Sequence, residues 1–164
     1  MLKASDIMTK NVISVSPDDT IQEAARLMFL NKLSGLPVLD EEDKVVGILT
    51  EADLVKKEKA VDLPLMFSLL GSLVYLDNPL NGDEIEKQLK DITAAKVGEL
   101  MSRVVVSVSP DTALEEAASL SLSKKANPIP VVAEGRVVGI ISRADFVKLI
   151  ADGKDLKENL PAEK

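Results

Sequence analysis

The sequence predicts an α/β (α+β) fold in which two copies of one β-α-β-β-α unit pack together about a pseudo-twofold axis. Three observations support it: an internal repeat, alternating helix and strand signals within each copy, and a composition suited to an aliphatic core. Apolar residues make up 46% of the 164 residues, and aromatic residues only 2%. This length fits one ordinary domain or two very small ones packed as a unit.

The internal repeat relates the two halves of the chain. Residues 14–18, Ser-Val-Ser-Pro-Asp, return as residues 107–111, a displacement of 93 positions. Further along, the displacement becomes 92, because the turn at 40–44 is one residue shorter in the second copy. One unit alone would expose an apolar sheet face, so we expect the two copies to pack together.

Each copy shows the same order of elements. In the first copy, residues 12–15 predict a short strand, and apolar spacing predicts a helix over about 20–31. Two hairpin strands follow at 36–39 and 45–50, and a second helix runs from 51 to about 59. Alternating helices and strands of this kind predict a mixed fold for each repeat.

Short polar motifs mark the expected helix starts and turns. Asp19 is placed to cap the first helix, with Gln22 three residues later. The second copy has Thr112 and Glu115 at these places, which form a capping-box pair. Gly135 suits a tight turn between the last two strands.

The repeat divides the chain into four segments. We predict a first repeat over 1–60, a connecting insert over 61–96, a second repeat over 97–152 and a polar tail over 153–164 that frays. An apolar stretch of the insert either covers the repeat core or forms a dimer surface, and the sequence leaves both open. An amphipathic helix is expected near its end, over 83–92.

Composition argues against several classes of function. A net charge of −7 argues against sequence-independent nucleic-acid binding. The absence of Cys and His removes disulfides, thiol chemistry, common zinc sites and imidazole catalysis. Without a Walker-type loop or a paired base and nucleophile, we expect neither an enzyme nor a metal site. No signal peptide or membrane-spanning run is visible, so we expect a cytoplasmic protein without membrane insertion.

One stretch occurs in both copies where a strand gives way to a helix. Residues 47–53 read Gly-Ile-Leu-Thr-Glu-Ala-Asp, and residues 139–145 read Gly-Ile-Ile-Ser-Arg-Ala-Asp. A hydroxyl followed three residues later by a carboxylate is a helix capping box. It also suits a ligand, because Asp can accept from ribose hydroxyls and Ser or Thr suits a phosphate. The preceding Gly favours the ligand, since a bare strand can line a flat molecule.

Taken in order and twice over, these motifs resemble a tandem pair of CBS domains, often called a Bateman module. The resemblance covers about 6–56 and 97–149. The motifs that carry it are residues 6–9, 14–18, 36–38, 47–53, 99–102, 129–131 and 139–145. It implies a disc-shaped module with two clefts between the repeats, and it suggests a homodimer.

The resemblance also implies a ligand and the residues that hold it. Similar proteins bind adenosine-containing molecules, so we expect AMP, ADP or ATP, with other adenosyl ligands open and no required cofactor. The implied contacts are Asp53 and Asp145 to ribose hydroxyls, Thr50 and Ser142 to ribose or phosphate, Asn11-Val12 and Val104-Val105 to the adenine edge, and Leu36, Pro37, Ile129 and Pro130 to the base.

The two corners differ in charge at one position. Arg143 stands where the first copy has Glu51, and a guanidinium neutralises a phosphate that a carboxylate repels. An acid at a helix N-terminus is also explained by the helix dipole alone. We therefore expect the cleft of Ser142, Arg143 and Asp145 to bind a phosphorylated adenosine more tightly than the other cleft.

Two functions stay open from the sequence. One is a ligand-sensing regulatory module that acts through an unknown regulated protein or through its own dimer. The other is an assembly or interaction module whose clefts are unused. A thermal-shift screen with adenosine nucleotides separates them, because a ligand that binds only the folded protein stabilises it.

Overall fold

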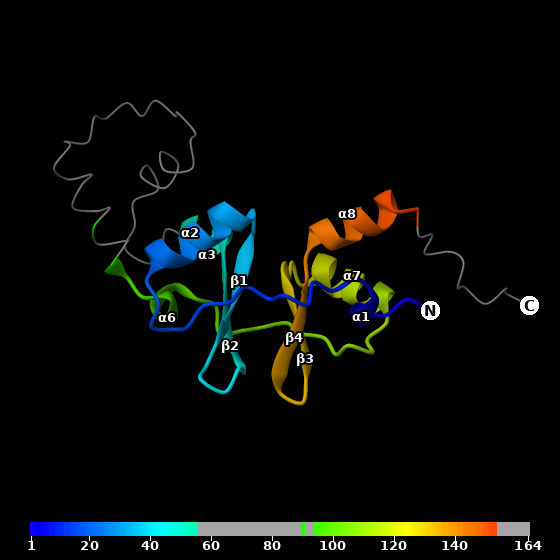
Figure 1. The fold of residues 1–164 in the computed structure, drawn as a ribbon, viewed down its shortest axis with the longest axis horizontal. Helices are drawn as coiled ribbons and strands as arrows, with labels where there is room; N and C mark the ends of the chain where they lie inside the picture. Colours follow the sequence, from blue (N-terminus) through cyan, green and yellow to red (C-terminus); the bar gives the residue numbers. More distant parts are fainter. Residues whose placement is uncertain (56–89, 91–93, 154–164) are drawn as a thin grey trace, which may run out of the picture.

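The computed structural model describes residues 1–55, 90 and 94–153. Its helices and strands are α1 (Ala4–Ile7), α2 (Ile21–Asn31), β1 (Gly35–Leu39), β2 (Val45–Thr50), α3 (Glu51–Val55), α6 (Val97–Leu100), α7 (Leu114–Ser123), β3 (Ile129–Ala133), β4 (Arg136–Ile141) and α8 (Arg143–Ala151). Figure 1 shows two hairpins side by side, with α2, α3 and α6 beside the first and α1, α7 and α8 beside the second. This arrangement is the mixed fold of two repeats that the sequence predicts.

The two hairpins form as predicted. Strands β1 and β2 pair antiparallel, and so do β3 and β4. The β3–β4 turn consists of Glu134 and Gly135, with φ of 52° and 79°. Positive φ at both central residues is the geometry that a two-residue turn needs to match the strand twist. Gly135 therefore closes the turn as expected.

The prediction of a strand over 12–15 is wrong, because these residues do not form a continuous strand. The structure reduces it to one parallel bridge between Val15 and Val38, and the second copy repeats this with Val108 and Val131. Each segment touches the outer edge of its own hairpin at one place only. The apolar pattern that suggested a strand instead reflects a buried side chain at Val15.

The opposite edge of each hairpin is completed by the segment that begins the other repeat. Ile48 of β2 bridges Ser102, and Ile140 of β4 bridges Thr9. Figure 1 shows the N-terminal segment passing from α1, beside the second hairpin, to α2, beside the first. The segment after α6 makes the reverse crossing, so the two repeats exchange their first segments.

The hydrophobic cores follow this exchange. Val97 and Met101, which begin the second repeat, are 0% and 5% exposed and belong to the core of the first hairpin. Ala4, which begins the first repeat, is 0% exposed in the core of the second hairpin, with Met8 packed against it. Neither core is complete without residues of the other repeat.

The predicted helix caps are wrong: the N-cap residues are Thr20 of α2 and Ala113 of α7, and Ala113 makes no side-chain cap bond, so Thr112 and Glu115 form no capping box. Helix α2 is capped by Thr20, whose hydroxyl accepts the Glu23 backbone N–H at 3.2 Å. Asp19 and its counterpart Thr112 instead accept backbone N–H groups three residues earlier, at 2.7 and 3.0 Å. Their side chains close the preceding turn, which removes them from the cap.

Parts of the predictions lie outside the described residues. They are the apolar stretch of the insert, the helix over 83–92 apart from Lys90, the second helix beyond Val55 and the tail beyond Gly153. Within the described part, none of the helices has the length and hydropathy that crossing a bilayer requires.

Candidate functional site

The corner that begins α8 is a capping box, and the corner that begins α3 has the same bonds from its hydroxyl residue to its Asp. The Thr50 backbone N–H and hydroxyl donate to Asp53 Oδ2 at 2.9 and 3.1 Å. In the same way, the Ser142 backbone N–H and hydroxyl donate to Asp145 Oδ2 at 2.6 and 2.8 Å. The capping interpretation is therefore confirmed. It does not exclude a ligand, because a carboxylate offers about four acceptor positions.

The structure explains the glycine before each corner differently from the prediction. A Cβ atom on Gly47 would lie 2.5 Å from the sulfur of Met101, and one on Gly139 would lie 2.4 Å from the sulfur of Met8. The bare strand therefore makes room for a methionine of the other repeat. The interpretation that these glycines line a flat ligand is wrong.

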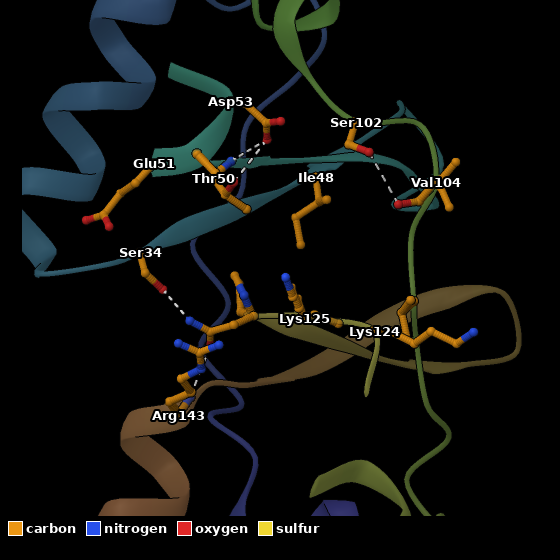
Figure 2. A pocket seen from close by; sticks show the side chains of 15 residues that line it. Ser34, Ile48, Thr50, Glu51, Asp53, Ser102, Val104, Lys124, Lys125 and Arg143 are labelled. Atoms are coloured by element: carbon orange, nitrogen blue, oxygen red, sulfur yellow. Dashed lines mark hydrogen bonds between the residues drawn. The ribbon is translucent and has the colours of Figure 1, made fainter. Parts of the chain in front are cut away.

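A cleft of about 530 Å³ lies between the first corner and the second repeat. The corner at 50–53 forms one wall, and Lys124, Lys125 and Arg143 lie on the opposite wall (Figure 2). Its complete lining is Ser34, Ile48, Thr50, Glu51, Ala52, Asp53, Ser102, Val104, Val106, Lys124, Lys125, Ala126, Asn127, Pro128 and Arg143. The cleft thus needs both repeats.

The structure brings part of the predicted ligand residues together. Those that line the cleft are Thr50, Asp53, Val104 and Arg143. Arg143 therefore lies opposite the first corner, whereas we expected it to share a cleft with Ser142 and Asp145. Asn127 of the same repeat holds Arg143 there, because its Oδ1 accepts the Arg143 backbone N–H at 3.0 Å while its Nδ2 donates to Ser34 of the first repeat.

The remaining predicted residues do not line this cleft. They are Ser142, Asp145, Asn11, Val12, Val105, Leu36, Pro37, Ile129 and Pro130. Leu36 and Ile129 are 0% and 1% exposed, and Pro37 and Pro130 are also fully buried. Leu36 and Ile129 belong to the two hydrophobic cores, and contact of these four residues with a base stays a prediction.

Four further polar residues line the cleft that the sequence does not predict as site residues: Ser34, Asn127, Lys124 and Lys125. Asn127 Nδ2 donates to Ser34 Oγ at 3.1 Å, and the Ser34 carbonyl accepts the Glu51 backbone N–H at 3.1 Å. Ser34 and Asn127 occupy equivalent places in the two copies, which was a visible signal. Lys124 and Lys125 were visible as a pair, but nothing local placed them opposite the first corner.

The electrostatics of the cleft favour an anion. Lys124, Lys125 and Arg143 line one wall, and none of the ion pairs between described residues engages them. Glu51 and Asp53 also line the cleft, so its lining has three positive and two negative charges, and a concave surface with an excess of one sign concentrates counter-ions. Among the described residues, no group of three or more Asp or Glu side chains is placed to hold a metal ion. The arrangement can therefore hold an anionic group opposite a hydroxyl and a carboxylate.

Several known proteins are similar to this chain in sequence. A model of the CBS domain matches residues 4–59 and 97–152. Uncharacterized protein MJ1426 of Methanocaldococcus jannaschii is 33% identical over 150 residues, which cover 88% of this chain and 89% of that protein. The inosine-5'-monophosphate dehydrogenase of the same organism is 34% identical over 147 residues, which cover 89% of this chain but 23% of that enzyme.

A solved structure agrees with the fold. The structure of CBSX2 of Arabidopsis thaliana in complex with AMP is 27% identical, with a TM-score of 0.67, and the match covers 94% of this chain and 100% of that one. The family match spans both repeats, and the hairpins and corners recur in each. The chain belongs to the CBS domain family and carries two CBS domains in tandem.

Proposed function

We propose that this chain is a regulatory module that binds an adenosine-containing nucleotide in the cleft between the corner at 50–53 and the second repeat. The observation that carries the proposal is the placement of a hydroxyl–carboxylate corner opposite three cationic side chains. The volume of about 530 Å³ falls in the usual range of small-molecule sites. The AMP complex of CBSX2 supports this choice of ligand.

The lining residues take distinct roles in this proposal. Asp53 accepts hydrogen bonds from ribose hydroxyls, and the Thr50 hydroxyl contacts ribose or phosphate. Val104, which is 84% exposed at the cleft, offers apolar surface to the base. Arg143 neutralises a phosphate. The preference for phosphate thus belongs to the first corner, which reverses the order that we expected from the sequence.

An assembly function is the second candidate. Phe29 on α2 and Leu122 on α7 occupy equivalent places in the two repeats and are 83% and 77% exposed. Exposed apolar side chains on helices often mark protein contacts. In this candidate the clefts are unused and the chain forms a homodimer through these helices. Light scattering of wild type and of Phe29→Glu with Leu122→Glu tests it.

Calorimetric titration with AMP, ADP and ATP tests the binding proposal. We expect Asp53→Asn to weaken binding by about tenfold, the effect of losing a charged hydrogen bond. Asparagine keeps an acceptor for the cap and nearly the same shape. Asp145→Asn is the matched control, because Asp145 caps α8 in the same way but does not line the cleft.

Thermal unfolding gives an independent measurement. A nucleotide at 100 times its Kd stabilises the folded chain by about 2.7 kcal/mol. If none of the three nucleotides gives heat or a thermal shift, the binding proposal is wrong and the assembly function is favoured. If Asp145→Asn abolishes binding while Asp53→Asn does not, the cleft has been assigned to the wrong corner.

A further inference from the structure

The second-repeat wall of the cleft carries more positive charge than one phosphate requires. We infer that Lys124, Lys125 and Arg143 form a polyphosphate-binding wall, so that the cleft selects adenosine ligands with two or three phosphates over AMP. The inference rests on the proposed function and names the ligand class of the same cleft. It also predicts weak binding of adenosyl ligands that carry a positive charge, because the cations of the wall repel them.

The three cations come from two elements that meet at the cleft. Lys124 and Lys125 follow the end of α7, and Arg143 is the first residue of α8. Figure 2 shows Arg143 near Ser34 at one end of the wall, Lys124 towards Val104 at the other end, and Lys125 between them. The positive charge therefore extends along the wall, as a chain of phosphates requires.

The three cations of this wall form no ion pair with another described residue. Three other described lysines are paired, namely Lys3 with Asp111, Lys44 with Glu42 and Lys96 with Asp18, whereas Lys10, Lys32 and Lys148 form no ion pair with a described residue. Lys124, Lys125 and Arg143 have no ion pair and no side-chain hydrogen bond between described residues. In a chain with a net charge of −7, a cluster of unpaired cations facing a cleft points to an anionic ligand.

The first repeat lacks this wall. Asn31 and Lys32 stand where the second repeat has Lys124 and Lys125, and Glu51 stands where it has Arg143. The equivalent positions thus carry one cation and one acid instead of three cations. Backbone geometry does not explain the difference, since Lys32 and the equivalent Lys125 both have positive φ, 54° and 52°. Glu51 and Asp53 also line this cleft, so its lining holds three cations against two acids and has an excess of positive charge.

Titration calorimetry with adenosine, AMP, ADP, ATP and S-adenosylmethionine tests the inference at constant ionic strength and without divalent cations. We expect affinity to rise with each phosphate, with ATP about tenfold or more tighter than AMP. S-adenosylmethionine should bind no tighter than adenosine. Because these ion pairs are exposed, 0.5 M salt should reduce the ATP-to-AMP ratio.

A paired substitution isolates the wall. Lys124→Gln with Lys125→Gln should lower the affinity for ATP by about tenfold and that for AMP by less than about threefold. The matched control is Arg136→Gln with Lys148→Gln, which removes two positive charges outside the cleft and should leave the ATP-to-AMP ratio unchanged. Thermal unfolding verifies that both variants fold.

The outcomes separate this inference from the proposed function. Equal affinity for AMP and ATP in the wild type, or an unchanged ratio in the lysine variant, overturns the polyphosphate wall. The proposed function still stands in that case if Asp53→Asn weakens binding. Absence of binding by every nucleotide overturns both.

Discussion

Two methionine–glycine contacts join the repeats at the scale of single residues. The sulfur of Met8 lies against Gly139, and that of Met101 lies against Gly47. The sequence shows the glycines but not the reason for them, because that reason depends on a methionine 131 residues away for Gly139 and 54 residues away for Gly47. Close packing of this kind makes each pair sensitive to one added methyl group.

Gly139→Ala tests the contact directly. The added Cβ would meet the sulfur, Cγ and Cβ of Met8 at 2.4, 2.8 and 3.1 Å, so we expect a loss of about 1–3 kcal/mol in the free energy of unfolding. Urea denaturation measures it. In a Met8→Ala background, Gly139→Ala should lower the free energy of unfolding by at least about 0.5 kcal/mol less than it does in the wild type. Strictly additive effects of the two substitutions would contradict the contact.

At the scale of elements, two ion pairs repeat the same connection. Lys3 Nζ lies 2.7 Å from Asp111 Oδ1, and Lys96 Nζ lies 3.0 Å from Asp18 Oδ1. Each pair links the segment that begins one repeat to the turn before the first long helix of the other. The hydrogen bond and charge of Asp111 raise the pKa of Lys3, and those of Lys3 lower the pKa of Asp111.

These shifts give the pair a defined pH dependence. Because the pKa of Asp111 is lowered on folding, its contribution to stability is present above the unfolded pKa of about 3.9 and is lost as the pH falls through the folded pKa. The raised pKa of Lys3 acts in the opposite sense. Its contribution is present below about pH 10.4 and is lost as the pH rises through the folded pKa.

Carboxyl ¹³C NMR titration of Asp111 checks this prediction. In Lys3→Met we expect the pKa of Asp111 to rise towards its ordinary value, and we expect 1 M salt to produce part of the same change. Lys148→Met is the control, because it removes an exposed lysine elsewhere. An unchanged Asp111 titration in Lys3→Met would show that the ion pair does not form in solution.

Local signals explain which elements could be predicted. The hairpin strands and the turn at Gly135 depend on neighbouring residues, and the structure confirms them. The strand over 12–15 could not be judged locally, because a strand needs partners along its length and this segment finds one at Val38. The cap of α2 moved to Thr20 because the preceding turn uses the Asp19 side chain.

At the scale of the whole molecule, the unit of packing differs from the unit of sequence. The sequence repeat predicts two consecutive units, whereas each hydrophobic core includes buried residues from the beginning of the other repeat. The same crossing explains the placement of the site. Thr50 and Asp53 could be identified from their motif, but Arg143, Lys124 and Lys125 reach the first corner only through the contact between repeats.

A double-mutant cycle tests the exchanged packing. Val97 begins the second repeat but is 0% exposed in the first core, so Val97→Ala should cost about 2 kcal/mol in unfolding free energy. Its effect should couple by at least about 0.5 kcal/mol to Leu49→Val of the first core and add independently to Ile141→Val of the second.

Urea unfolding of these variants gives the coupling energies. Val147→Ala is the control for the same chemical change at an exposed position and should alter stability by no more than about 0.5 kcal/mol. Coupling of Val97 to Ile141 but not to Leu49 would mean that each repeat closes its own core.

The exchange of first segments has the symmetry of a closed dimer within one chain. The contact of Met8 with Gly139 is matched by that of Met101 with Gly47, as a twofold interface requires. A chain with one repeat could obtain its missing segment only from a second copy. The connection between the repeats therefore converts a bimolecular association into an intramolecular one. The tandem chain keeps its fold on dilution, whereas the stability of its separated halves would depend on their concentration.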